Sequence, residues 1–293
     1  MNTIKLEKIS VENTKREFPN IKYIDNDLVL IEDATKIKYA NEPRRVTCKC
    51  FGLCTQGTAE YTLNTVKHTL RSGDIIIINN GQVISDYHQS DDFEGIALQI
   101  SDAFFYEIFS SVHGLSMHFT FSRLHPVFHL NTEEKDNIIT YFNLIKEKVA
   151  QTEHHFRRDT VRSLLQALIY DTAESIANFQ QNSTMKNSRA ETIFVSFIQK
   201  VEENFRDKRR VSWYARSLNI TAKYLSETIK QVSMRTPNDW IDDYVVLEIR
   251  VLLRNSTKSI KEIAEYMNFP NQSFFGKYFK EHVGMSPSEY RKR

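Results

Sequence analysis

Near its C-terminus the chain alternates aromatic residues with small, polar and basic ones, in the run NQSFFGKYFK at residues 271–280. On a helix, Phe275 and Phe279 fall on one face, which turns the residues between them toward the other face. The outward positions are Gln272, Ser273, Gly276 and Lys277. Gln can bind the edge of adenine through two hydrogen bonds, and Lys can reach O6 and N7 of guanine. These residue types and spacings predict a helix whose exposed face contacts DNA bases, the alternative being that its polar residues are only solvated.

The same arrangement occurs 50 residues earlier. Counted from the capping residues Thr221 and Asn271, both copies have apolar residues at +4 and +8, Lys at +9, Pro at +16 and an aromatic residue at +19. The outward residues of the first copy are Lys223, Ser226, Glu227 and Lys230. Glu227 could accept a hydrogen bond from cytosine N4 or could repel phosphates, and both interpretations stay open. The internal repeat predicts two structural units of the same type.

Each copy has the features of a helix-turn-helix motif. Ala215 and Ala264 are small enough for the first helix to cross the second closely. Asn219 and Asn268 stand where the first helix must end in a left-handed residue, a conformation that Asn tolerates. Residues 238–254 between the copies predict a single helix about 25 Å long. Such a spacer could hold two recognition helices roughly one DNA turn, about 34 Å, apart, so that one chain would contact two successive major-groove segments.

These residues closely resemble the DNA-binding domain of the AraC/XylS family of bacterial transcription regulators. The family's C-terminal signature is matched by Phe269, Phe274-Phe275, Phe279-Lys280, Gly284, Ser286-Pro287 and Tyr290-Arg291, and its spacer by Leu252-Leu253-Arg254, Ser259-Ile260 and Ile263-Ala264. The resemblance covers about residues 190–293. Asn268 and Met234 depart from the family pattern by replacing turn glycines. Gly276 departs from it inside the second recognition helix, where it costs roughly 1 kcal/mol of helix propensity and would permit closer approach to DNA.

The repeat and the resemblance together imply a set of DNA-contacting residues. The residues expected at base edges are Lys223, Ser226, Glu227, Gln272, Ser273, Gly276 and Lys277. The residues expected near phosphates are Thr221, Lys230, Asn271 and Lys280. The aromatic residues of the second copy, Phe274, Phe275, Tyr278 and Phe279, are expected to pack in the core and beside phosphates rather than to stack on bases. The run Lys208-Arg209-Arg210 is expected to be exposed charge, either solvated or in contact with the DNA backbone.

The first two thirds of the chain have a different pattern of apolar residues. Residues 21–130 contain short strands separated by turns, which predicts a barrel or sandwich, and helical periodicity follows over residues 131–149 and 156–179. The run RSGDIIIINNGQVI at residues 71–84 resembles a hairpin of the cupin-like sensor domain that many AraC-family members carry, and the two helices resemble its dimerisation region. The predicted fold is therefore α+β and multidomain. It comprises a cupin-like effector-binding β-barrel at 1–130, a helical connector or dimerisation region at 131–179, a linker at 180–189, and an all-α domain with two helix-turn-helix motifs joined by a long helix at 190–293.

Cysteine and histidine residues form no recognisable metal motif in the sequence. Cys48, Cys50 and Cys54 are too close and odd in number for a disulfide framework, which fits a reducing cytoplasm. Cys48 and Cys50 would share one face of a strand and are expected to be small core residues, with metal or redox sensing as the alternative. An enzymatic cupin would normally show a Gly-x5-His-x-His run, whereas the histidines at 68, 88, 113, 118, 125 and 129 are scattered. We therefore expect no metal, no cofactor and no enzymatic activity.

Composition and charge agree with this organisation. The chain is 41% hydrophobic and 26% charged, has no apolar run of membrane-spanning length, and begins with a charged segment unlike a secretory signal. Residues 190–293 hold 18 Lys and Arg against 13 Asp and Glu, whereas the rest of the chain holds 21 against 24. Only the C-terminal third thus favours a polyanionic partner.

The sequence predicts a cytoplasmic, sequence-specific DNA-binding transcription regulator, with activation favoured over repression. The expected partners are promoter DNA, a small-molecule effector, a second copy of the chain in a homodimer, and RNA polymerase; no membrane partner is expected. Two alternatives stay open. One is a constitutive regulator whose barrel binds no ligand and only dimerises, and the other is a metal-independent cupin enzyme with an attached DNA-binding domain.

Overall fold

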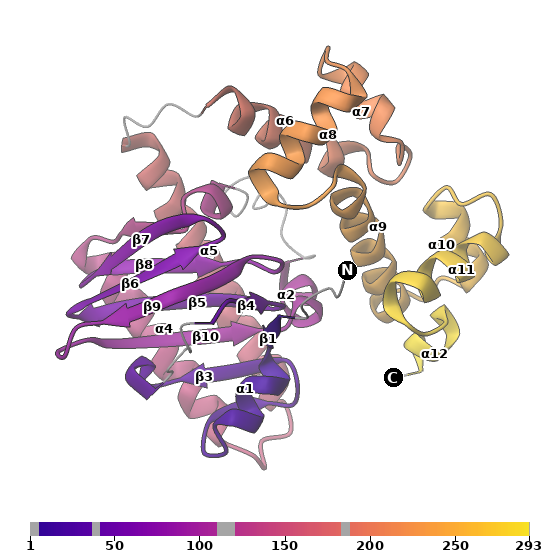
Figure 1. Ribbon diagram of the computed structural model, residues 1–293. Helices are drawn as coiled ribbons and strands as arrows, with labels where there is room; N and C mark the ends of the chain where they lie inside the picture. The colour runs from indigo at the N-terminus through magenta and orange to yellow at the C-terminus, as the bar shows by residue number, and fades with distance from the viewer. Residues whose placement is uncertain (1–5, 37–41, 110–120, 183–187, 293) are drawn as a thin grey trace. The chain divides into compact units, whose positions relative to one another are not determined.

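The computed structural model describes residues 6–36, 42–109, 121–182 and 188–292, which fall into two compact units that divide between residues 182 and 188 (Figure 1). The N-terminal unit combines β-strands with several helices. The described part of the C-terminal unit contains only helices. None of the helices in the described ranges is long and apolar enough to cross a membrane.

Two sheets form the framework of the N-terminal unit. One has the strand order β1-β4-β9-β6-β7 and the other the order β11-β8-β5-β10-β3-β2. The strands are β1 (Glu7–Ile9), β2 (Lys22–Ile24), β3 (Leu28–Ile31), β4 (Arg44–Val46), β5 (Lys49–Gln56), β6 (Thr58–Leu63), β7 (Val66–Arg71), β8 (Asp74–Ile78), β9 (Val83–Gln89), β10 (Glu94–Ile100) and β11 (Val127–His129). Neighbouring strands are antiparallel except for the pair β1 and β4.

Tight turns carry the chain from one sheet to the other. Gly57 (φ 69°) separates β5 from β6 and Gly73 (φ 88°) separates β7 from β8, and in each case the two strands belong to different sheets. A side chain at Gly57 would meet the backbone of Phe93, so this turn requires glycine for space as well as for conformation. The described strands thus form two sheets around a common apolar core, in agreement with the barrel or sandwich that the sequence predicts.

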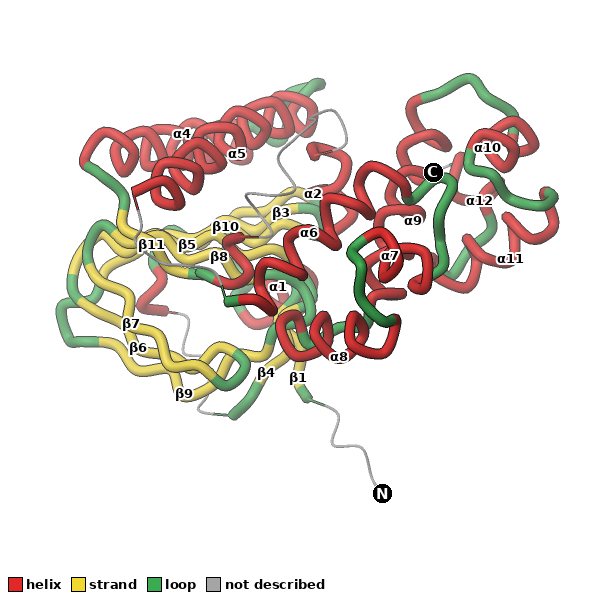
Figure 2. The backbone as a smooth tube through the Cα atoms, turned by 90° about the horizontal axis from the view of Figure 1, so that it is seen from above, coloured by secondary structure: helices red, strands yellow, loops and turns green. Residues whose placement is uncertain are grey.

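Two long helices cover the six-stranded sheet. They are α4 (Thr132–Ala150), which begins at the predicted capping residue Asn131, and α5 (Arg157–Asn182). Figure 2 shows both helices running over this sheet. Their apolar stripes include Ile138 and Leu168, which lie beside Phe51 and Leu98 of the sheet. The region expected as a connector is therefore packed as part of the N-terminal unit.

An ion-pair network joins α5 to the shorter helix α2 (Asp102–Phe109). Arg158 donates hydrogen bonds to both carboxylate oxygens of Glu107, at 3.0 and 2.8 Å, and Arg162 adds a third at 3.1 Å. Burial raises the pKa of Glu107, but the two guanidinium groups together lower it by more, so its pKa lies below the ordinary value. Two smaller elements, α1 (Val11–Glu17) and the 3-10 turn η1 (Ala34–Lys36), complete the unit.

The segment expected as a linker, residues 180–189, is helical at 180–182 and again at 189. Helix α5 continues through Asn182, and Ser188 already caps the next helix, α6 (Arg189–Asn204). Residues 183–187 lie outside the described residues. The polar composition of 180–182 gives no helical periodicity, so the sequence did not reveal that α5 continues through them.

The C-terminal unit is built around one long helix, α9 (Pro237–Asn255), as the sequence predicted. The other helices are α6, α7 (Val211–Ser217), α8 (Ala222–Ser233), α10 (Ile260–Tyr266), α11 (Gln272–Val283) and α12 (Pro287–Arg291). Helices α6, α8, α10, α11 and α12 all contact α9. Aromatic residues at the repeated +19 position fix each half of the unit, since Trp240 packs edge-on against Phe194 and Tyr290 against Phe279.

Candidate nucleic-acid interface

The two repeats fold as two helix-turn-helix motifs, α7–α8 and α10–α11. Asn219 (φ 55°) and Asn268 (φ 50°) adopt the predicted left-handed conformation in the two turns. The next residues return to the preceding helix in the same way: the Ile220 N–H donates to the Ala215 carbonyl (3.0 Å), and the Phe269 N–H donates to the Ala264 carbonyl (2.9 Å). Both alanines are buried, as close helix crossing requires. The turn chemistry predicted from the repeat is confirmed.

The recognition helices α8 and α11 begin and end at equivalent residues. Thr221 accepts from the Tyr224 N–H (3.1 Å), and Asn271 accepts from the Phe274 N–H (2.9 Å), so both act as N-caps. At the other ends, Met234 (φ 58°) and Gly284 (φ 85°) are left-handed caps. Met234 therefore stands at a position where its side chain is strained and where glycine is the natural choice.

Each recognition helix buries one face and exposes the other. Leu225, Ile229, Phe275 and Phe279 are fully buried. The predicted base-contacting residues Lys223, Glu227, Gln272, Ser273 and Lys277 are exposed, whereas Ser226 and Gly276 are half-buried at the edge of this face. Among the predicted phosphate-contacting residues, Thr221, Lys230, Asn271 and Lys280 are all exposed. A Cβ atom added at Gly276 would meet no atom within 4 Å, so the glycine is not needed for packing.

The aromatic residues of α11 do not share one role. Phe275 and Phe279 are core residues as predicted, but Phe274 is 63% exposed. Tyr224, which occupies the same +3 position in the first copy, is 41% exposed. Phe274 therefore does not pack in the core, because +3 and +4 lie 100° apart on a helix and only +4 is buried. That Phe274 lies beside phosphates, the other part of the expectation, stays a prediction. Both repeats have an aromatic residue at +3, and a comparison of the two copies could have revealed this shared exposed position.

A junction between the two motifs involves the loop before α7. The Arg209 guanidinium lies over the Phe269 ring, 3.9 Å from its centroid, and donates a hydrogen bond to the Met267 carbonyl at the C-terminus of α10. Asp207 in the same loop accepts a hydrogen bond from the Asn268 side chain. Arg209 is thus not the exposed charge expected within the run 208–210; it joins the loop to the turn of the second motif. Lys208 and Arg210 are exposed, as expected.

The spacer helix α9 holds the second recognition helix from its other side. The Tyr278 hydroxyl donates to Asp242 (2.7 Å), and the Phe269 ring lies 5.2 Å from the Tyr278 ring. Burial raises the pKa of Tyr278, and the hydrogen bond to Asp242 raises it further, so the phenol stays a donor. In the loop, Arg206 pairs with Glu248 of α9 (2.6 Å). These contacts fix the orientation of α11 relative to the spacer, and no local sequence pattern reveals them.

The comparison with protein-family models matches residues 214–293 to a helix-turn-helix domain. These residues form an AraC-type helix-turn-helix domain. The predicted resemblance is confirmed for this part of the chain. Similar proteins include the melibiose operon regulatory protein of Escherichia coli (strain K12), which is 28% identical over 137 residues, covering 46% of this chain and 45% of the relative. The virulence regulon transcriptional activator VirF of Yersinia enterocolitica is 30% identical over 91 residues, covering 31% of this chain and 34% of VirF. The chain spans less than half the length of these relatives.

Solved structures give similar matches. The C-terminal domain of AraT from Geobacillus stearothermophilus is 29% identical and covers 36% of this chain and 88% of that chain, with a TM-score of 0.34. ToxT from Vibrio cholerae is 15% identical and covers 91% of this chain and 94% of that chain, with a TM-score of 0.35.

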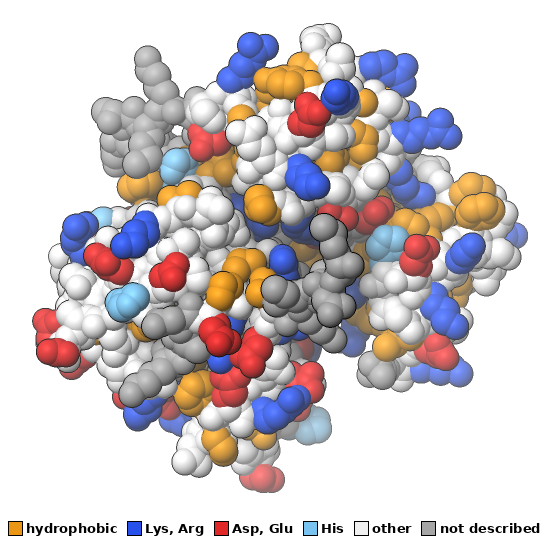
Figure 3. All heavy atoms as spheres, viewed as in Figure 1, with side chains coloured by type: hydrophobic (Ala, Val, Ile, Leu, Met, Phe, Trp, Pro, Cys, Tyr) orange, Lys and Arg blue, Asp and Glu red, His pale blue; other side chains and the backbone are white. Residues whose placement is uncertain are grey.

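Positive charge in the AraC-type domain is spread over both recognition helices. Lys223 and Lys230 extend from α8, and Lys277 and Lys280 extend from α11. Lys223 is only weakly paired with Glu227, at 4.0 Å with both side chains largely exposed, so water screens this contact. Figure 3 shows further Lys and Arg side chains over the helical unit on the side facing the viewer. Lys223 and Lys277 lie in the first two turns of their helices, whereas Lys230 and Lys280 lie in the last turns. These exposed lysines and the capped N-termini of the two helices can attract phosphates and place side chains against base edges.

The three cysteines of the N-terminal unit are buried in its core, as expected of small core residues. The Cys48 and Cys50 sulfurs lie 3.6 Å apart, and burial raises the pKa of Cys54 to about 11. Thiols that stay protonated are poor nucleophiles and poor metal ligands. Across the described ranges, no three His, Cys, Asp or Glu residues are arranged to hold a metal ion; His113 and His118 lie outside those ranges.

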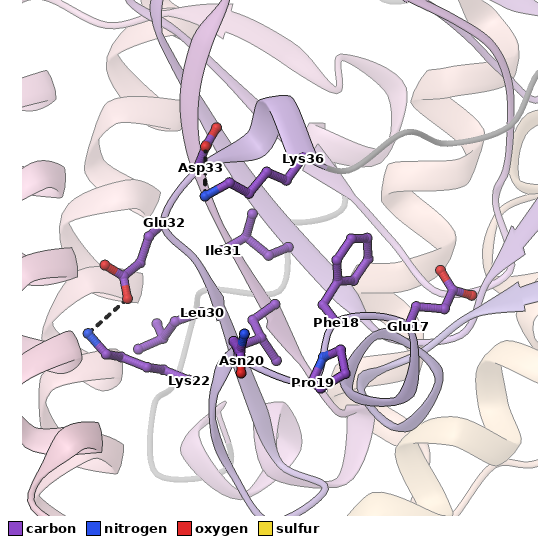
Figure 4. A pocket seen from close by; sticks show the side chains of 11 residues that line it. Glu17, Phe18, Pro19, Asn20, Lys22, Leu30, Ile31, Glu32, Asp33 and Lys36 are labelled. Atoms are coloured by element: carbon purple, nitrogen blue, oxygen red, sulfur yellow. Dashed lines mark ion pairs between the residues drawn. The ribbon is translucent and has the colours of Figure 1, made fainter.

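The N-terminal unit also contains a cavity of about 510 Å³ beside β3, lined by residues from α1, the following loop, β2, β3 and η1 (Figure 4). Phe18, Leu30 and Ile31 provide apolar surface. In Figure 4 the Lys22–Glu32 pair and the Lys36–Asp33 pair lie on different sides of Ile31. Glu32 is bonded to Lys146 (2.7 Å) as well as Lys22 (2.8 Å), and these lysines lower its pKa. The cavity has the size and mixed lining of a small-molecule site.

Proposed function

We propose that the chain is a transcription regulator of the bacterial cytoplasm that binds promoter DNA sequence-specifically and activates transcription. The observation that carries the proposal is the pair of helix-turn-helix motifs whose recognition helices expose polar and basic residues at matching positions. The similarity to the melibiose operon regulatory protein and to the transcriptional activator VirF supports it. Helix α9 has 19 residues, about 28 Å at 1.5 Å per residue, which suits two motifs docked in successive major-groove segments.

In this proposal the exposed face of each recognition helix enters the major groove. Base edges are contacted by Lys223, Ser226, Glu227, Gln272, Ser273, Gly276 and Lys277, and phosphates by Thr221, Lys230, Asn271 and Lys280. The caps Thr221 and Asn271 lie where the helix N-terminus favours an anion. Half-buried Ser226 and Gly276 would contact DNA at the edge of each helix, whereas the fully exposed lysines can reach farther.

Binding of the full-length chain to a randomised duplex library tests the proposal directly. We expect a selected sequence to bind far more tightly than random DNA, with an affinity that falls steeply with salt. Gln272→Ala and Lys277→Ala should each relax preference at one position by about 1–3 kcal/mol. Lys280→Ala should instead weaken binding to every duplex and lower the salt slope by about 1.

Lys261→Ala is the matched control for the lysine variants, since Lys261 is exposed on α10 and pairs only weakly with Glu265, at 3.9 Å. It removes the same charge away from the recognition helices. Absence of salt-dependent duplex binding by the full-length chain would refute the proposal.

We further infer that the N-terminal unit senses a small molecule, dimerises, or does both, and that the bound regulator contacts RNA polymerase. A ligand that favours one arrangement of the unit would change promoter occupancy. The cavity of about 510 Å³ beside β3 supports the sensing role. A thermal-shift screen of the full-length chain against metabolites should find a stabilising ligand, and Ile31→Trp, which fills the cavity, should abolish that stabilisation.

Two outcomes separate the alternatives. If no metabolite stabilises the chain while sedimentation shows a dimer, the unit serves dimerisation alone. Turnover of any small molecule by the full-length chain would instead indicate an enzyme and contradict the non-enzymatic role.

A further inference from the structure

Two exposed aromatic side chains occupy the same position in the two recognition helices. Tyr224 is 41% exposed and Phe274 is 63% exposed, and each is the third residue after its N-cap. Neither ring packs against another aromatic ring within the described parts of the chain. Their neighbours at the next position, Leu225 and Phe275, are fully buried. The core contacts of each helix are thus made by these neighbours and do not require the residue at +3. Single exposed aromatics are common on proteins, but the same exposure at the same position of a repeat points to a shared role.

The geometry of the helix places these rings beside the predicted base-contacting residues. At 100° per residue, +2, +3 and +6 fall within one arc of about 100°, on the side opposite the buried +4 and +8. In α11 these positions are Ser273, Phe274 and Lys277. They lie in the first two turns of the helix, and the N-terminal residues of a recognition helix are those that contact base edges. A ring at +3 is therefore held in the part of the helix that enters the groove.

The chemistry of the groove restricts what an apolar ring can contact there. Base edges in the major groove present hydrogen-bond donors and acceptors, and their one apolar group is the C5-methyl of thymine. Phe274 has no polar atom with which to bind a phosphate or a donor. Leaving its ring in water, or placing it against an acceptor, gains nothing, whereas covering a methyl group removes apolar surface of both partners from water.

We propose, building on the proposed DNA-binding function, that Phe274 and Tyr224 each cover a thymine methyl group, in two successive major-groove segments. The two thymines occupy equivalent positions of the segments, about one helical turn or 10 base pairs apart. Tyr224 can in addition donate its hydroxyl proton to a phosphate, which Phe274 cannot do. The operator should therefore prefer thymine at one position in each of the two segments, as each recognition helix has one aromatic ring at +3.

Removing single methyl groups from the DNA tests this inference. The probe is the tightest duplex selected by the full-length chain, in which each thymine is replaced in turn by deoxyuridine. For the unmodified protein, loss of one methyl at one position in each segment should weaken binding about fourfold, the equivalent of one buried methylene. In Phe274→Ala the loss at the second segment should vanish while the loss at the first remains, and Tyr224→Ala should show the reverse. Phe274→Leu, which stays apolar, should keep part of the effect.

The outcomes separate this inference from the proposed function. If the variants bind the duplex but deoxyuridine costs them as much as it costs the unmodified protein, the thymine contacts are refuted and the DNA-binding function stands. The thymine contacts are refuted in the same way if deoxyuridine leaves the affinity of every protein unchanged. If no selected duplex binds in a salt-dependent way, the proposed function itself fails. Both side chains are exposed, so their truncation is not expected to unfold the domain.

Discussion

Substitution of Arg209 by alanine should weaken the contact between the loop before α7 and the second helix-turn-helix motif, without unfolding either motif. Arg209 lies 3.9 Å from the centre of the Phe269 ring, a contact of about 1 kcal/mol. It also donates to the Met267 carbonyl, and a hydrogen bond from a charged donor is worth about 1.5–3 kcal/mol. Its Nε is buried without a partner, and burial lowers the pKa of the guanidinium, so roughly 1 kcal/mol must be subtracted for desolvation. The net loss is about 2 kcal/mol.

This loss should appear in DNA binding as a cost specific to the second motif. A loosened second motif must be reordered each time both motifs bind one duplex. The affinity of Arg209→Ala for a duplex with both segments should therefore fall by up to about 30-fold, the equivalent of 2 kcal/mol. Its affinity for a duplex whose second segment is scrambled should change far less. Fluorescence anisotropy with the two duplexes at fixed salt measures both values.

Arg210→Ala is the matched control for this experiment. Arg210 is next in sequence and exposed, and its side chain makes no hydrogen bond or ion pair within the described residues, so its removal changes the net charge equally. If Arg209→Ala and Arg210→Ala weaken binding to the two duplexes in the same proportion, charge alone explains the effect. The claim that Arg209 positions the second motif would then be refuted.

Three further substitutions test other parts of the structure. Gly276→Ala should stabilise the chain against thermal unfolding by about 1 kcal/mol, because no atom obstructs the added methyl group. The same variant should bind DNA more weakly if the glycine permits close approach. An unchanged DNA affinity would exclude that role. Met234→Gly should add about 1 kcal/mol in the same melts, since it relieves a left-handed φ of 58° at an exposed cap; a destabilised variant would contradict the strain. Glu107→Gln should destabilise the chain near neutral pH but progressively less as the pH falls below about 4.5, the ordinary pKa of the group. The folded-state pKa is lowered, so the stabilisation is present above the unfolded pKa and is lost on acidification; melts between pH 7 and 3 that differ by a constant amount would contradict this.

Much of the C-terminal unit could be predicted because its signals are local. Caps, turn asparagines and apolar positions act within a few residues of one another, so Thr221 and Asn271 were identifiable as N-caps and Asn219 and Asn268 as left-handed residues. The repeat strengthened each assignment by supplying a second example. The exposure of Phe274 was missed because adjacent aromatic residues suggest one shared core, whereas neighbouring positions on a helix point 100° apart.

The N-terminal unit was predictable only in outline. Strand composition indicated a barrel or sandwich, as the structure has it. Which strands pair in each sheet depends on the turns at Gly57 and Gly73 and on long-range pairing that no short segment records. The cavity beside β3 likewise brings together residues from α1, β2, β3 and η1. None of these residues belongs to a recognisable sequence motif, and they form a site only because the fold brings them together.

The sequence by itself determined the kind of C-terminal domain, its two recognition helices and the residues that these helices expose, because a helix period and its caps are set by neighbouring side chains. Only the tertiary structure decided how the second motif is held. Arg209 looked like one of three exposed basic residues until folding placed Phe269 and Met267, about sixty positions away, against it. A guanidinium gains from a ring face and a helix C-terminus only when both are brought within contact distance, and that distance is a property of the folded domain.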